Sequence, residues 1–208
     1  MSDFRYYRPD AFPPVVKNLI IINVLVFLAQ LVLDNQILLT ARIGLWPVDY
    51  PFFKPYQVIT HMFTHGSVMH ILFNMFALWM FGRVLENVWG PKRFLFFYLA
   101  CGIGAAVFHL LIQYLSGGGS LTVGASGAVM GVMVGFAYLF PNTEMFIFFI
   151  PFPIKAKWVA IGYVAIDLFS GIANVAGDNI AHFAHLGGAI TGFILVLIWN
   201  KSDRRRFY

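Results

Sequence analysis

Ser126 stands out as a reactive group in an otherwise apolar stretch. It lies in the segment TVGASGAVMG, with Gly124 and Ala125 before it and Gly127 after it, at the start of a long apolar run. A hydroxyl in such a run lies at or below a membrane surface, where it serves either to hold helices together or as a nucleophile. Holding helices together is the commoner use of an intramembrane serine. The rest of the chain must decide between the two.

The last apolar run offers a general base for this serine. A serine that attacks a carbonyl needs a group that accepts its proton, and histidine has a suitable pKa at neutral pH. His185 opens the segment HLGGAITG, and His182 lies one helical turn before it. Gly188 and Gly192 share one helix face, and glycines follow Ser126 at similar spacing. Because stripes of small residues let two helices approach closely, we predict that the serine and His185 meet.

His70 and Asn74 form a second candidate pair. They lie four residues apart, so a helix presents both side chains on one face. Two donors aimed at one point suit an oxyanion site, where each can stabilise the transition state by about 3 kcal/mol. The backbone N–H of Ser126, at the start of a helix, would be a third donor. The alternative is that His70 and Asn74 only tie neighbouring helices together.

The composition assigns the chain to the membrane. Of its 208 residues, 60% are hydrophobic and 11% are charged, whereas about a quarter are charged in ordinary soluble domains. No charged region followed by a short apolar core and a cleavage site precedes the first apolar run, so we expect no removable signal peptide. The single cysteine, Cys101, lies within an apolar run, which excludes an intrachain disulfide and a cysteine metal cluster.

Six apolar runs are expected to cross the membrane as helices. Prolines, glycines and polar clusters separate these runs, which are residues 15–33, 67–88, 93–115, 126–139, 158–172 and 181–199. The predicted fold class is therefore an all-α polytopic membrane protein. Its six-span domain occupies residues 15–199, between an amino-terminal tail at residues 1–14 and a basic tail at residues 200–208.

The connections between these runs are expected to stay outside the membrane core. Residues 34–64 contain prolines, aromatic residues and few charges, which fits a loop in the interfacial zone. The segment TEMFIFFIPFPIKAK holds two prolines and is interpreted as a short interfacial connection. The segment NVAGDN is interpreted as a turn.

The basic residues support this number of spans. With six crossings, 12 of the 14 lysine and arginine residues fall on the side of the amino terminus, and only Arg42 and Lys54 fall opposite. The positive-inside rule then places both termini in the cytoplasm. The net charge of +5 is interpreted as orientation and attraction to anionic lipid. Nucleic-acid binding is not expected, because no basic cluster has the necessary fold context.

This topology also predicts that polar residues gather at one depth. The spans at 67–88, 126–139 and 181–199 run in the same direction, so residues early in each lie at a similar distance below the outer surface. Ionisable groups inside a membrane mark functional sites by default. The residues in this layer are His70, Asn74, Ser126, His182 and His185.

The same residues carry a resemblance to a known family. The chain resembles the rhomboid intramembrane serine proteases in HILFNM around His70 and Asn74, in GRVLENVWG, in GASGA around Ser126 and in AHLGGAITG around His185. These motifs, in this order and with six apolar spans, cover residues 56–192. The resemblance implies a rhomboid-like bundle of six transmembrane helices.

The resemblance also implies an activity. It implies a Ser126–His185 catalytic dyad without a third acidic member, with His70, Asn74 and the Ser126 amide binding the oxyanion. The reaction would be hydrolysis of peptide bonds in or near the transmembrane segments of other membrane proteins, with no cofactor and no metal. We therefore expect partners among single-span or other transmembrane proteins and membrane lipid.

The resemblance implies a location and further structural features. It implies a water-filled cavity open to the outer face, a partly embedded first outer loop, and a substrate gate at residues 158–172. We expect a multi-pass protein of a bacterial inner membrane. Met130 stands where relatives often carry an aromatic residue. Tyr56 and Gln57 replace a common Trp-Arg pair, a departure that concerns the anchoring of the first outer loop.

The remaining polar residues are expected to have supporting roles. Glu86 is expected to be structural because it lies far from the outer layer. For Asp167, a hydrogen bond to a neighbouring helix or access to the cavity is favoured over a proton relay. By family likeness, His61 and His65 are expected to fix the first loop through hydrogen bonds. His109 is expected to be packed or hydrogen-bonded.

Two other classes of protein are considered. A catalytically silent rhomboid-like protein that only binds membrane clients would normally lack the serine or the histidine, and both are present here. A small transporter would be expected to show internal repeats or paired broken helices, and neither is visible in the sequence. The protease interpretation is therefore preferred.

Overall fold

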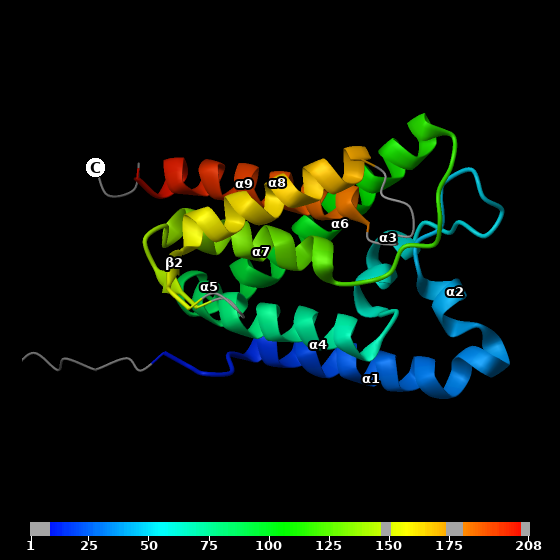
Figure 1. Ribbon diagram of the computed structural model, residues 1–208. Coiled ribbons are helices and arrows are strands. Elements are labelled where there is room, and N and C mark those ends of the chain that lie inside the picture. Colours follow the sequence, from blue (N-terminus) through cyan, green and yellow to red (C-terminus); the bar gives the residue numbers. More distant parts are fainter. Residues whose placement is uncertain (1–8, 147–150, 174–180, 205–208) are drawn as a thin grey trace, which may run out of the picture.

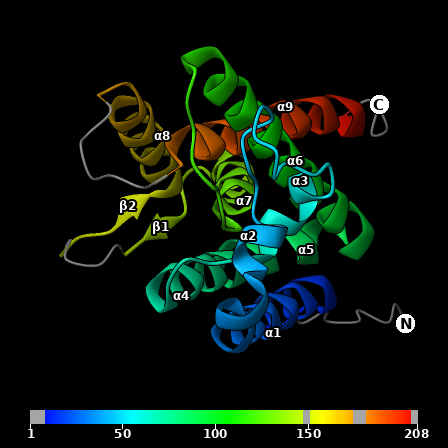
Figure 2. The same ribbon diagram turned by 90° about the vertical axis from the view of Figure 1, so that its right-hand side faces the viewer.

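A computed structural model describes residues 9–146, 151–173 and 181–204. Its long helices lie side by side in one bundle (Figures 1 and 2), and α1 begins at the end of the bundle where α9 stops. Five helices in the described residues are long and apolar enough to cross a membrane. They are α1 (Pro14–Ile37), the continuous helix Val68–Trp89, α6 (Pro91–Ser116), α8 (Ala156–Ala173) and α9 (His182–Arg204). Five predicted spans are thus confirmed as helices, although α9 continues beyond residue 199.

The boundary between the second and third of these helices follows directly from the sequence. Gly90 has a φ of 78°, a conformation that residues with a Cβ rarely adopt. Pro91 then occupies the first position of α6, where its missing N–H costs no intrahelical hydrogen bond. The glycine ends one helix, and the proline starts the next.

The helix Val68–Trp89 is not uniform. It consists of α4 (Val68–Ala77), a π-helical turn (Leu78–Gly82) and α5 (Arg83–Trp89). A Cβ added at Gly82 would lie 3.1 Å from a methyl group of Val16 on α1. The absence of a side chain at Gly82 therefore lets α1 pack closely against the π-helical turn, which the sequence patterns did not predict.

Helix α7 (Ser126–Leu139) has the predicted bounds but only 14 residues. At 1.5 Å per residue it is about 21 Å long, which is less than the hydrocarbon core of roughly 30 Å. It lies at the centre of the bundle (Figure 2). The chain reaches it through an extended segment, where Thr122 pairs with Leu45 and the Gly124 N–H donates to the His61 carbonyl at 3.0 Å. The predicted span at residues 126–139 is therefore a helix with the predicted bounds, preceded by an extended segment.

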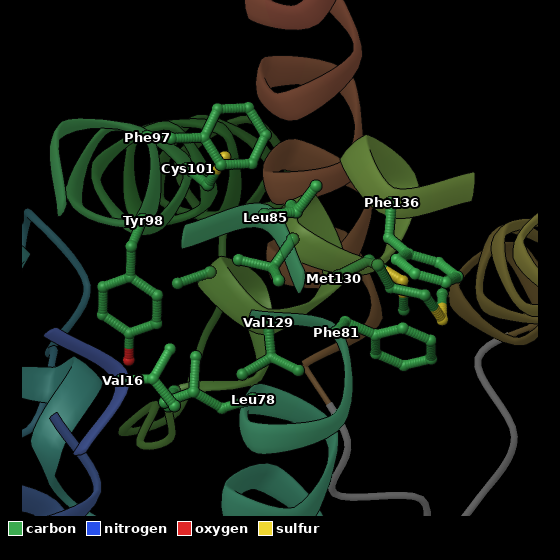
Figure 3. Close-up of a cluster of buried hydrophobic side chains, with 14 of the residues drawn as sticks. Val16, Leu78, Phe81, Leu85, Phe97, Tyr98, Cys101, Val129, Met130 and Phe136 are labelled. Carbon is green, nitrogen blue, oxygen red and sulfur yellow. The ribbon is translucent and has the colours of Figure 1, made fainter. Parts of the chain in front are cut away.

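The bundle is apolar both inside and outside. Buried side chains gather where α7 meets α6 and the helix Val68–Trp89 (Figure 3); they include Leu85, Phe97, Cys101, Met130 and Phe136. Large apolar side chains on α1, α4 and α8 are exposed. Such an outer surface suits a lipid environment, where only polar groups need to be sheltered.

The shorter connections agree in part with expectation. The segment TEMFIFFIPFPIKAK contains two antiparallel strands, β1 (Glu144–Met145) and β2 (Ile154–Lys155), so its described part is a hairpin and not a crossing. Its residues 147–150 and the predicted turn NVAGDN lie outside the described residues. The loop after α1 contains α2 (Leu39–Ile43), α3 (Gln57–Thr60) and a 3₁₀ turn (His61–Phe63).

Gln57 anchors this first loop. Its side chain is buried, and its Nε2 donates to the carbonyls of Arg42 and Phe52, each at 3.1 Å. Its Oε1 accepts from the backbone N–H of Lys54 at 3.1 Å. A single amide thus joins α2 to the segment at residues 52–54. The departure from the Trp-Arg pair leaves the loop well anchored.

Candidate active site

Helices α7 and α9 touch through their backbones. A Cβ added at Gly188 would lie 1.8 Å from the Gly127 carbonyl oxygen, and one added at Gly192 would lie 2.7 Å from that of Gly131. No side chain fits at either position. The predicted close approach of the two glycine stripes is confirmed at these pairs, whereas Gly135 faces Phe97 on α6.

This contact joins the predicted catalytic pair. Ser126 is the first residue of α7, and His185 lies in the first turn of α9. Ser126 Oγ lies 2.7 Å from His185 Nε2, within hydrogen-bond distance, although 59 positions separate the residues in the chain. Both side chains are partly buried. The serine and the imidazole are therefore in direct contact.

Asp167 of α8 lies on the other side of the imidazole. His185 Nδ1 is 3.1 Å from both Oδ1 and Oδ2 of Asp167. The resemblance implied a dyad without a third acidic member, and the structure places a carboxylate in contact with the histidine of that dyad. A carboxylate accepts hydrogen bonds only, so the Nδ1 atom carries the proton and donates it. The neutral ring then has its lone pair on Nε2, where it can accept the Ser126 hydroxyl.

His182 approaches the same carboxylate. Its Nδ1 lies 2.7 Å from Asp167 Oδ1, so the expected hydrogen bond from Asp167 to a neighbouring helix is confirmed for two histidines. Ligand atoms of Asp167, His182 and His185 lie within 4.8 Å of one another, close enough to hold a metal ion. These atoms are already joined by hydrogen bonds. The hydrogen bonds satisfy the polar groups of all three side chains, so none of them needs a metal ion as a partner.

His70 lies beside the serine. The Gly66 N–H donates to His70 Nδ1 at 3.4 Å, so a neutral ring carries its proton on Nε2. A Cβ added at Gly124 would lie 2.7 Å from His70 Nε2 and 3.5 Å from Ser126 Oγ. Gly124 also has a φ of 126°. Space and backbone conformation thus both require glycine here, and the His70 N–H lies close to the serine.

Asn74 is directed differently. Its Nδ2 donates to the His70 carbonyl at 2.9 Å, within its own helix. One of its two amide hydrogens is thus engaged, and the other remains available. The structure places Ser126, His185, His182 and His70 together, but it does not aim Asn74 at the same point as His70.

Two supporting residues have the expected roles. His109 Nε2 lies 2.8 Å from Thr122 Oγ1 and so steadies the segment before α7. Glu86 accepts the backbone N–H groups of Val15 and Val16 at 2.9 and 2.8 Å. These are orphan donors in the first turn of α1. The structural role expected of Glu86 is confirmed.

The two loop histidines are buried and neutral. Burial lowers the pKa of His61 to about 4 and that of His65 to about 3. His61 Nδ1 bonds to the Gln57 carbonyl at 2.9 Å, as expected for a residue that fixes the loop. His65 fixes the loop through its backbone N–H, which donates to Gln30 at 3.0 Å. Its ring nitrogens have no hydrogen-bond partner in the described part of the chain.

The sequence is similar to those of several known proteins. It is 30% identical over 212 residues to RHOMBOID-like protein 12, mitochondrial, of Arabidopsis thaliana, covering 93% of this chain and 60% of that protein. It is 33% identical over 189 residues to Rhomboid protein 1, mitochondrial, of Saccharomyces cerevisiae, covering 80% and 52%. It is 29% identical over 194 residues to the human Presenilin-associated rhomboid-like protein, mitochondrial, covering 90% and 50%.

These relatives bear on location and family. The chain spans between half and about three fifths of their lengths. All three are named mitochondrial, so they do not support the expected bacterial inner membrane. The Rhomboid domain model matches residues 53–202, a range that includes α3 to α8, nearly all of α9, and the residues His70, Asn74, Ser126, Asp167, His182 and His185. The chain is an integral, multi-pass membrane protein and belongs to the rhomboid family.

Proposed function

We propose that this protein is an intramembrane serine endopeptidase. One observation carries the proposal: Ser126 Oγ and His185 Nε2 lie 2.7 Å apart inside a bundle whose outer surface is apolar. A serine in contact with an imidazole lone pair can lose its proton during attack on a carbonyl. A serine that only held helices together would not need such a base.

The reaction proceeds through an acyl-enzyme. Ser126 Oγ attacks the substrate carbonyl carbon while His185 Nε2 accepts the hydroxyl proton. The tetrahedral intermediate collapses when His185 returns that proton to the leaving amine and the peptide C–N bond breaks. Water then attacks the ester with the same base, releases the carboxyl product and restores Ser126.

Donors around Ser126 stabilise the intermediate. Its backbone N–H, at the first position of α7, has no partner within the helix and lies at the positive end of the helix dipole. The His70 Nε2–H lies next to Gly124, close to Ser126 Oγ. Asn74 completes the oxyanion site only if its free amide hydrogen turns towards the substrate. Its contribution should therefore be the smaller of the two side chains.

The membrane topology follows from the charges. We infer six crossings, with α7 and the extended segment before it forming the fourth, and both termini on the cytoplasmic side. Arg42 and Lys54 lie in the loop at the end of the bundle opposite to the start of α1 and the end of α9 (Figure 1). Ser126 and His185 begin their helices towards that loop, so the site would open to the outer face.

The substrates are transmembrane proteins. A site enclosed by lipid-facing helices receives its peptide bonds from segments that already lie in the membrane, from single-span or other membrane proteins. Lipid is the surrounding partner, and no nucleic acid is expected. No metal or other cofactor has a role in this mechanism, so chelators should leave the rate unchanged.

Cleavage by the purified protein tests the proposal. The full chain in liposomes is incubated with a single-span substrate that carries small and helix-destabilising residues. We expect two fragments from the wild type and none from Ser126→Ala. Ser120→Ala, which alters an exposed loop serine, is the matched control and should cleave normally. Cleavage that persists in Ser126→Ala would refute the assignment of the nucleophile.

A further inference from the structure

We propose that Asp167 is a positioning residue that holds His185 in its reactive tautomer and supports it when it becomes charged. This inference rests on the proposed function, because it assigns Asp167 a role in the same reaction. The site then consists of three residues in hydrogen-bond contact, each on a different helix. They are Ser126 on α7, His185 on α9 and Asp167 on α8.

The hydrogen-bond pattern determines the tautomer. Both oxygens of Asp167 lie 3.1 Å from His185 Nδ1, and Ser126 Oγ lies 2.7 Å from Nε2. An imidazole with its proton on Nε2 would leave Nδ1 with a lone pair facing a carboxylate. The proton on Nδ1 avoids that repulsion and leaves Nε2 as the acceptor. Asp167 thus sets which nitrogen faces the serine.

The charge of the carboxylate matters later in the cycle. When His185 accepts the serine proton, it becomes an imidazolium in a surrounding of low dielectric. A carboxylate in contact with Nδ1 offsets that positive charge where water cannot. Asp167 itself keeps no proton from the serine; the proton moves from Ser126 Oγ to His185 Nε2 and on to the leaving amine.

His182 holds the carboxylate in place. Its Nδ1 contacts Asp167 Oδ1 at 2.7 Å, a shorter contact than either oxygen makes with His185. Oδ1 therefore receives hydrogen bonds from both His182 and His185, and Oδ2 receives one from His185. With Oδ1 fixed by His182, the plane of the carboxylate is set so that both oxygens face His185. This arrangement gives His182, one helical turn before His185, the role of orienting the Asp167 carboxylate.

The packing of α8 points to the same role. On this helix the buried residues are Ala156, Ala160 and Asp167, while its large apolar side chains are exposed. A carboxylate on an otherwise lipid-facing helix is costly unless it is paired. The two alanines pack α8 against the bundle two to three turns before Asp167, and Gly171, where an added Cβ would lie 3.3 Å from His182 Cβ, brings α8 close to α9 one turn after it. The carboxylate of this helix is thus directed at His185.

Asp167→Asn is the decisive variant. An asparagine N–H donates to Nδ1 and forces the ring proton onto Nε2, so kcat should fall by about 10²- to 10⁴-fold while KM changes little. Asp167→Glu keeps the charge and should recover part of kcat. Glu86→Gln makes the same chemical change at a buried carboxylate at the far end of the bundle and should leave kcat per folded molecule unchanged.

A spectroscopic measurement separates positioning from mere support of the fold. In protein labelled with ¹⁵N-histidine, His185 should show a protonated Nδ1 in the wild type and a protonated Nε2 in Asp167→Asn, with its signals assigned by their loss in His185→Gln. A wild-type ring protonated on Nε2 would overturn the proposal, even if the variant fails to fold. So would a kcat in Asp167→Asn within about threefold of the wild type.

The outcomes also distinguish the two proposals. A wild type that cleaves, together with an Asp167→Asn variant that cleaves equally well, ends the role of Asp167 and leaves the protease assignment intact. A wild type that cleaves no better than Ser126→Ala ends the proposed function itself.

Discussion

The pair α7 and α9 and the single helix α8 hold the same site in different ways. The first two helices meet backbone to backbone, and a Cβ at Gly188 or Gly192 would collide with the carbonyls of α7. On α8, by contrast, Ile166, Phe169 and Ile172 are largely exposed, and Gly162 has nothing within 4 Å of an added Cβ. The first contact is made by backbone atoms, whereas α8 contacts the bundle through a few buried side chains and through Gly171, where an added Cβ would lie 3.3 Å from His182 Cβ.

This difference separates two parts of the chemistry. The proposed nucleophile and base lie on the α7–α9 pair, and the carboxylate that contacts the base lies on α8. The role proposed for Asp167 therefore depends on the side-chain contacts that hold α8 against the bundle.

The largest loss of activity is expected from substitutions of Ser126 and His185, on α7 and α9. His185→Ala should abolish cleavage, a loss on the order of 10⁶-fold in kcat for residues that act as a unit. Combining it with Ser126→Ala should add nothing, because neither residue works without the other. The measurement is the rate of substrate cleavage in liposomes. Independent, multiplicative losses in the double variant would show that the two residues do not form one catalytic unit.

Next in size is the oxyanion site. His70→Ala should lower kcat by about 10²- to 10³-fold, the usual cost of one lost donor. Asn74→Ala should leave more activity, because its Nδ2 already donates to the His70 carbonyl. Steady-state cleavage kinetics compare the two variants. A greater loss for Asn74→Ala would mean that the asparagine turns towards the substrate and carries the main interaction.

The two helix contacts can be compared by adding one methyl group. Gly188→Ala places a Cβ against the Gly127 carbonyl and should cost about 1–3 kcal/mol of stability. Gly162→Ala on α8 meets open space and should be neutral or slightly stabilising, since glycine within a helix costs about 0.5–1 kcal/mol. Unfolding of both variants in detergent measures this. An equal loss of stability in Gly188→Ala and Gly162→Ala would mean that the two glycines are packed equally closely, which would contradict the account.

The last comparison concerns the dependence of stability on pH. Burial lowers the pKa of His61 to about 4 and of His65 to about 3, so the unfolded chain binds more protons below its ordinary histidine pKa of about 6.5. Stability should be constant above that pH and should fall as the pH drops from about 6.5 towards 4. Unfolding midpoints across this range measure it. A midpoint that rises on acidification would contradict the burial of neutral rings.

Much of the helical fold could be predicted from the sequence. Long apolar runs mark the helices, and pairs such as Gly90 and Pro91 mark their ends, because both signals act locally. The extended conformation of the segment that leads into α7 was not predicted. The backbone of the extended segment before it is satisfied by Leu45 and His61, and no local pattern reveals partners about 60 to 80 positions away.

The site was predicted unevenly for the same reason. Ser126 and His185 could be paired from the glycine stripes of their helices, which determine how close the backbones come. The partner of Asp167 depends on which face α8 turns towards the bundle. The alanines at 156 and 160 give the available signal, since a helix with few buried residues turns its small side chains and its only carboxylate inward. The anchoring role of Gln57 could not be predicted for the same reason, because its partners Arg42, Phe52 and Lys54 come together only in the folded loop.

Labelling with a fluorophosphonate probe tests the central claim most directly, because it asks whether one hydroxyl in the bundle is activated. The full chain in liposomes is treated with the probe and mapped by peptide mass. We predict that the wild type is modified at Ser126 and that His185→Ala, in which the 2.7 Å contact is lost, is not. Equal labelling of Ser126 in both proteins, or labelling at another serine alone, would contradict the account.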